Sequence, residues 1–164
     1  MSAGLAFPNQ DISVQLLEWL ELNRALEVDK VFLYVLQLQD RTLRALEHHS
    51  RELGFLELTD LPLPGDQPNG WDHQYLYFRD KYLSHVRHEN IAQNDCFYRH
   101  MYEFEYISIL DIDELIVPQL DDTSVPEMIG SVQSYCPDHD SINLANYYFL
   151  TDYKMNRIRN GVPK

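Results

Sequence analysis

The sequence predicts an α/β sandwich with a largely parallel sheet, and two observations carry this prediction. Segments rich in β-branched and aromatic residues alternate with segments whose apolar residues recur at helical spacing, as in folds built from strand–helix–strand units. The apolar segment at residues 106–110 also leads directly into three carboxylates at 111–114, and open parallel sheets bind their ligands where strands end. We expect residues 1–164 to form a single domain.

Composition and charge narrow the class of protein. Hydrophobic residues make up 45% of the 164 residues and include eleven Tyr and seven Phe, which is enough for a packed core and argues against disorder. The formal net charge is −13, from 26 acidic and 13 basic residues, which argues against binding to a nucleic-acid backbone or an anionic membrane surface. This acidic excess is compatible with a protein that recruits a cation.

The sequence predicts neither a targeting segment nor a cysteine-based site. The sequence holds no run of roughly 18 apolar residues, so no membrane-spanning segment is predicted. The N-terminus has no basic region followed by an apolar core, so no signal peptide is predicted. Cys96 and Cys136 form neither a disulfide framework nor a zinc signature, and whether they pair stays open.

The first elements predicted are a strand, a helix and a second strand. Ala3–Phe7 is short and apolar and is interpreted as a strand remnant. Asp11 is placed to cap a helix. The buried stripe expected for this helix consists of Ile12, Leu16, Trp19, Leu20 and Leu26. Lys30–Leu36 is rich in β-branched and aromatic residues, which is typical of a buried strand.

A second helix and strand are expected to follow. Asp40 is placed to cap a helix that ends at Gly54, and Phe55–Thr59 is predicted to be a short strand. The helix is expected to carry Leu43, Leu46 and Leu53 on one side. Residues 61–70 (LPLPGDQPNG) combine Pro, Gly and Asn and predict a loop.

The second half of the chain is expected to continue the alternation. The pattern predicts a helix over Glu89–Tyr102, a buried strand over Tyr106–Leu110, a short helix over Ser124–Tyr135 and a further strand over Ser141–Leu150.

The most informative motif is the acidic segment that follows Tyr106–Leu110. Carboxylates inside an apolar segment lose water, and a divalent metal ion would compensate for this loss. In an extended backbone Asp111 and Asp113 would point to the same side, and two hard oxygen ligands suit Mg²⁺ or Mn²⁺. The alternative is an ordinary acidic turn after a strand. The sequence has neither a dinucleotide-binding glycine motif nor a P-loop, so a metal ion would have to hold the phosphates of a bound nucleotide.

Two longer segments, one of which contains the acidic motif, resemble a known protein family. Residues 15–35 (QLLEWLELNRALEVDKVFLYV) and 93–118 (QNDCFYRHMYEFEYISILDIDELIVP) resemble glycosyltransferase family 92, as does the region around 146–150 more weakly. The resemblance runs from about Pro8 to about Leu150. It implies a GT-A-like fold, as in nucleotide-diphospho-sugar transferases, and inverting, Mn²⁺-dependent transfer of a hexose, galactose foremost, from a UDP-sugar to a glycan acceptor. It also implies a Golgi location, with a membrane anchor on the full-length protein.

The resemblance assigns roles to the carboxylates of the acidic motif. Asp113 matches the direct metal ligand, and Asp111 matches a residue that reaches the ribose, the metal ion or both. Glu114 fits the motif as a group that orients its neighbours.

It also points to the helix predicted over Glu89–Tyr102. Asn94 and Asp95 match positions that bind the donor, although the polar face of a helix explains them equally well. Arg99 pairs either with a phosphate or with Asp95 four residues earlier, and we favour the ion pair.

The sequence also departs from the family pattern. It begins close to the first expected strand and ends at Lys164, before the acceptor half, so we interpret it as the truncated donor half of the enzyme. The catalytic base stays unknown, because Asp138, Asp140 and Asp152 are carboxylates in no recognisable pattern. We therefore expect little transfer activity from this chain alone.

Three functional hypotheses follow. The first is a metal-dependent glycosyltransferase. The alternative is a truncated, non-catalytic copy that binds a nucleotide or a partner. A metal-dependent phosphate hydrolase that uses the same carboxylates is a further rival.

Overall fold

Three parallel strands form the sheet of this protein. The computed structural model describes residues 2–3, 11–79, 81–119 and 121–148. β1 (Ser2–Ala3) pairs with β2 (Val31–Val35), and β2 pairs with β3 (Leu56–Asp60). Both pairs are parallel and the strand order is β1-β2-β3. The predicted α/β class with a parallel sheet is confirmed, and the strands predicted at 30–36 and 55–59 are correct to within one residue at each end.

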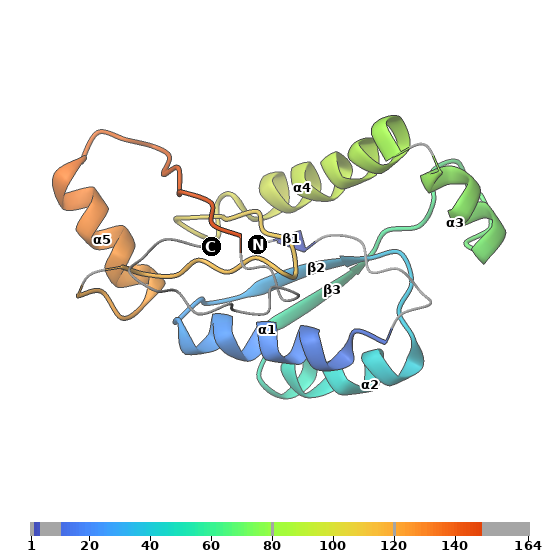
Figure 1. The fold of residues 1–164 in the computed structure, drawn as a ribbon, viewed down its shortest axis with the longest axis horizontal. Coiled ribbons are helices and arrows are strands. Elements are labelled where there is room, and N and C mark those ends of the chain that lie inside the picture. The colour runs from blue at the N-terminus through green and yellow to red at the C-terminus, as the bar shows by residue number, and fades with distance from the viewer. Residues whose placement is uncertain (1, 4–10, 80, 120, 149–164) are drawn as a thin grey trace, which may run out of the picture.

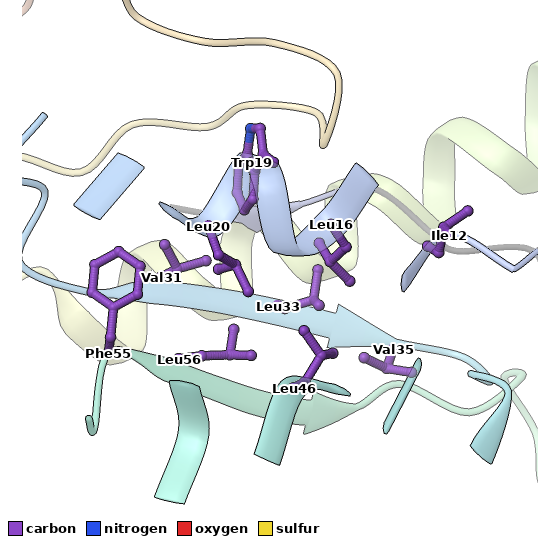
Figure 2. Packing of buried hydrophobic residues seen from close by; sticks show 10 residues of the cluster. All are labelled: Ile12, Leu16, Trp19, Leu20, Val31, Leu33, Val35, Leu46, Phe55 and Leu56. Carbon is purple, nitrogen blue, oxygen red and sulfur yellow. The ribbon is translucent and has the colours of Figure 1, made fainter. Parts of the chain in front are cut away.

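The central strand β2 is buried on both sides, and all five of its residues are inaccessible. Since side chains alternate along a strand, Phe32 and Tyr34 face α4 (Val86–His100), whereas the other three face α1 (Ser13–Ala25) and α2 (Asp40–Glu47). Figure 1 shows α1 and α2 together on one side of the sheet and α4 on the other. The cluster on the side of α1 consists of Ile12, Leu16, Trp19, Leu20, Val31, Leu33, Val35, Leu46, Phe55 and Leu56 (Figure 2).

The predicted stripe of α1 is confirmed except at its end, because Leu26 is only partly buried. The carboxylate of Asp11 accepts hydrogen bonds from the backbone N–H and the hydroxyl of Ser13 at 3.0 and 2.6 Å. Ile12 rather than Asp11 occupies the N-cap position. Asp11 therefore supports the start of the helix from one residue further out than predicted.

The predicted apolar side of the second helix is wrong in two positions. Leu46 is fully buried, but Leu43 and Leu53 are 40% and 46% exposed. After Glu47 the backbone widens into a π-helical turn over His48–Glu52, which shifts Leu53 around the helix axis, whereas Leu43 lies before this turn on the exposed side of α2. Gly54 ends the helical segment as predicted, with a φ of 63° that favours glycine.

Helix α3 (Trp71–Phe78) follows the loop at 61–70 and is absent from the sequence prediction. Only Gln74 and Phe78 of this helix are buried, so it shows no apolar stripe with a helical period. Its N-cap is Gly70, which offers no side-chain capping bond. A second π-helical segment, Lys81–His85, leads into α4, and α4 confirms the helix predicted over Glu89–Tyr102.

Two predicted strands are wrong. Residues 106–110 form no strand and only Ile109 makes an isolated bridge, while Tyr106 and Ile109 are 36% and 48% exposed. The segment instead packs Leu110 onto the cluster beside α1. Residues 141–148 of the predicted strand Ser141–Leu150 are mostly exposed coil, and its last two residues lie outside the described part of the chain. Apolar and aromatic composition predicted a strand in both cases, but no neighbouring strand pairs with either segment over more than one described residue.

The predicted helix at 124–135 is confirmed as α5 (Val125–Tyr135). Ser124 caps it by accepting from the Glu127 N–H, and the Glu127 carboxylate accepts from the N–H and hydroxyl of Thr123. The Val125 N–H donates to the Leu26 carbonyl at 3.0 Å, which attaches the start of α5 to the end of α1.

The orientation of α1 gives a stability prediction. Leu20 is 0% exposed, whereas Leu22 on the same helix is 50% exposed. Leu20→Ala should lower the free energy of unfolding by about 2–5 kcal/mol, because it leaves a cavity under the helix. Leu22→Ala is the matched control and should change it by less than about 0.5 kcal/mol. Urea unfolding measures both, and equal losses would contradict this orientation.

Candidate functional site

The carboxylates of residues 111–114 lie on a tight turn. The Glu114 N–H donates to the Asp111 carbonyl oxygen at 3.0 Å, and the Asp111 N–H donates to the Glu114 carboxylate at 3.1 Å. A bond between residues three apart requires a folded backbone at Ile112 and Asp113. The extended conformation from which Asp111 and Asp113 were predicted to share one side is therefore wrong. The Glu114 carboxylate bonds to the backbone of Asp111, and its predicted role beside a metal ion stays a prediction.

The turn at residues 111–114 is held against helix α1 by contacts with side chains of that helix and its apolar cluster. The indole Nε1–H of Trp19 donates to the Glu114 carbonyl oxygen at 2.7 Å, and Trp19 is only 4% exposed. Figure 2 shows the indole nitrogen directed away from the sheet, toward the chain that passes over α1. Leu110 and Ile112 pack against the same apolar cluster. The turn is thus attached to α1 by both an apolar and a directional contact.

The turn concentrates negative charge. Loss of water raises the pKa of Asp111 above its ordinary value, although part of the residue reaches solvent, and the charges of Glu114 and Asp113 raise it further. The His85 imidazole has a smaller effect in the opposite direction. Asp113 and Glu114 are therefore close enough to disfavour the charge on Asp111, and a cation nearby would favour that charge.

Asp111 and Asp113 carry donor atoms of the type that a divalent metal ion binds. Among the described residues, no group of three or more His, Cys, Asp or Glu side chains is arranged to hold a metal ion. Asp111 and Asp113 offer hard carboxylate oxygens, which Mg²⁺ and Mn²⁺ prefer, and both ions keep several water or phosphate oxygens when bound by so few side chains.

The predicted donor-binding residues of α4 gather at another place. Asn94 and Asp95 line an open groove on this helix, together with Asn90, Ile91 and Tyr98. The Asn94 amide donates to the Asn90 carbonyl oxygen at 2.7 Å, a bond within the helix itself.

Asp95 connects α4 to the sheet. Its carboxylate accepts from the Tyr34 hydroxyl at 2.6 Å and from the Arg99 guanidinium at 2.8 and 3.0 Å, so the predicted Asp95–Arg99 ion pair is confirmed. The bonds from Arg99 and then Tyr34 lower the pKa of Asp95. Burial, followed by the bond to Asp95, raises the pKa of Tyr34. Roles of Asn94, Asp95 and Arg99 in donor binding stay predictions.

The other candidate residues are dispersed. Cys96 is buried on α4 and Cys136 is exposed after α5, and both are free thiols. Asp138 and Asp140 are exposed, and Asp152 lies outside the described residues.

Trp19 is the residue at this site that sequence reasoning missed. Its place in the apolar stripe of α1 predicted burial correctly but gave no sign of the hydrogen bond to a residue 95 positions away. A tryptophan at the edge of a stripe is a weak signal of this kind, because a buried indole N–H usually finds an acceptor.

Comparison with known protein families gives a match for this chain. The family model described as glycosyltransferase family 92 matches residues 2–160. Searches of the curated proteins and of the solved structures gave no match. In the described part of the chain, none of the helices has the length and apolar character needed to cross a membrane.

The charge of the acidic turn predicts a pH-dependent stability. Since the folded-state pKa of Asp111 is raised, the folded protein binds this proton more tightly than the unfolded chain does, and ionised Asp111 destabilises the fold at neutral pH. Asp111→Asn should raise Tm at pH 7 in EDTA, and the gain should disappear as the pH falls to about 3, where the carboxyl is protonated in both states. Asp138→Asn, at an exposed position outside the turn, is the control. A Tm gain that persists at acid pH would contradict this account.

Proposed function

The chain belongs to glycosyltransferase family 92, and on this premise we propose that it binds a UDP-sugar together with a divalent metal ion at the acidic turn. The sugar, a hexose and galactose in the first instance, would pass to a glycan acceptor with inversion at the anomeric carbon. We further propose Mn²⁺ as the ion, a GT-A arrangement of the sheet and a Golgi location. Family membership supports the transfer of a sugar between a donor and an acceptor, and the finer assignments are ours.

One observation carries the proposal more than any other. The Asp111–Glu114 turn gathers three carboxylates within four residues, and a hydrogen bond from Trp19 attaches it to α1. A structural turn gains nothing from this concentration of negative charge, whereas a cation that also binds a pyrophosphate is attracted by it. The closed form of the turn, with Glu114 bonded to the Asp111 N–H, leaves the Asp111 and Asp113 carboxylates for a ligand.

In the proposed mechanism each carboxylate of the turn has a separate role. Asp113 and Asp111 would hold the ion, and Glu114 keeps the backbone of Asp111 in place through its hydrogen bond. When bound, the ion would neutralise the pyrophosphate and stabilise the leaving UDP. The acceptor hydroxyl must lose its proton as it attacks the anomeric carbon, and we assign this base to none of the described residues.

Metal-dependent UDP binding tests the proposal directly. Calorimetry with Mn²⁺ should show UDP binding that EDTA abolishes, because the two carboxylates hold the ion only together with phosphate oxygens. Asp113→Asn should weaken this binding by about tenfold or more, since even residues that merely support metal ligands cost that much when changed. Asp138→Asn should bind as the unmodified chain does. Equal UDP affinity with and without metal would reject the proposal.

A product assay separates the rival functions. We expect UDP release from UDP-galactose with Mn²⁺ to be slow for this chain alone, to depend on a glycan acceptor and to yield a glycosylated product. Release of phosphate or UMP without an acceptor would indicate a phosphate hydrolase instead. UDP binding without any turnover would indicate the non-catalytic alternative.

A further inference from the structure

Trp19 lies where helix α1 meets the acidic turn, and its surroundings leave it little freedom. The side chain is 4% exposed, and its indole N–H bonds the Glu114 carbonyl oxygen at 2.7 Å. Its own backbone carbonyl accepts from the amide of Asn23 at 2.8 Å, and Asn23 is 1% exposed. The indole therefore presents its donor from a fixed position.

The bond to Glu114 differs in kind from the other contacts of the turn. Leu110 and Ile112 pack against the cluster beneath α1, and such apolar contacts allow a segment to slide. The bonds between Asp111 and Glu114 fix the shape of the turn but not its place on the protein. Within the described residues, the hydrogen bond that fixes the turn on α1 is that from the Trp19 indole.

The Trp19 bond holds the acidic turn in place against the repulsion among its own carboxylates. With no cation bound, the like charges of Asp111, Asp113 and Glu114 on one tight turn favour any rearrangement that separates them. A contact that holds ligand groups together before the ligand arrives increases affinity, because less order has to be created on binding.

We propose that Trp19 is a positioning residue of the glycosyltransferase reaction: its indole N–H holds the Asp111–Glu114 turn in the form that receives the metal ion and the UDP-sugar. This rests on the proposed function of the turn, and Trp19 touches neither ion nor sugar in this role. It acts through the Glu114 carbonyl.

Trp19→Phe is the direct test, since it keeps an aromatic ring in the buried stripe and removes the donor. We expect UDP affinity in Mn²⁺ to fall by about three- to tenfold, the effect of losing one positioning hydrogen bond. A purely structural role would lower Tm without weakening the binding of UDP by the folded protein, so Tm and affinity are measured on the same samples. Normal metal-dependent UDP affinity in folded Trp19→Phe would overturn the proposal.

Trp71→Phe is the matched control. It makes the same chemical change on α3 at a residue that is 50% exposed and whose ring lies 6.4 Å from that of Tyr75. UDP affinity should be unchanged in this variant.

The Trp71→Phe variant also keeps Trp19 as the sole tryptophan of the chain, which holds two. Paramagnetic Mn²⁺ quenches a nearby indole, so adding Mn²⁺ with UDP should quench Trp19 emission, while diamagnetic Mg²⁺ with UDP should not. This measurement decides the matter if Trp19→Phe fails to fold. Quenching then supports the proposal, and unchanged emission despite bound UDP overturns it.

The two levels of failure are distinguishable. An unmodified chain that shows no metal-dependent UDP binding would overturn the proposed function, and the role of Trp19 with it. Normal metal-dependent binding in Trp19→Phe would overturn only the role of Trp19.

Discussion

The structure depends on one strand that has no free face. All residues of β2 are buried, so each side of the sheet must be covered by helices whose apolar residues match the alternation of that strand. Successive crossovers that move in the same direction along a parallel sheet lie on the same side of it, which places α1 and α2 together (Figure 1). The opposite face falls to α4, and the bond from Tyr34 to Asp95 sets that helix against the strand. Through α1 the same strand also determines where the acidic turn lies, because Trp19 belongs both to the cluster on β2 and to the contact with Glu114.

The acidic turn and the α4 residues show two different uses of a carboxylate. Asp95 has both of its oxygens bonded to neighbours on the protein, and its lowered pKa reflects a charge that the fold itself satisfies. Asp111 has the opposite electrostatics, since its pKa is raised by lost water and by like charges. A carboxylate that the fold leaves unsatisfied is the better candidate for a ligand. This contrast ranks Asp111 above Asp95 among the residues that the family resemblance singled out.

Sequence reasoning succeeded where one periodic signal dominated. The stripe of α1, the β-branched run of β2 and the capping residues of α5 each predict their element without help from distant residues. It failed at Tyr106–Leu110 and at residues 141–148. Both segments have the composition of a strand, but neither pairs with a neighbouring strand over more than one described residue. It failed at α3 because a helix that buries only Gln74 and Phe78 has no stripe to detect. The conformation of the acidic motif was predicted wrongly, because a bond between Asp111 and Glu114 is one of several local outcomes that the same residues permit.

The span of the Trp19–Glu114 contact has a consequence for how the protein reaches its working form. The bond joins residues 95 positions apart, so it closes only after the intervening chain has folded or collapsed. A contact between residues this far apart closes a long loop, and contacts of this kind are associated with slower folding. Capture of a cation at the turn would then draw on the native ensemble and shift the folding equilibrium toward it. If the turn binds a cation as proposed, a chain in which the Trp19–Glu114 contact is open would lack the ordered site, so the ion would select chains in which this long-range contact has closed.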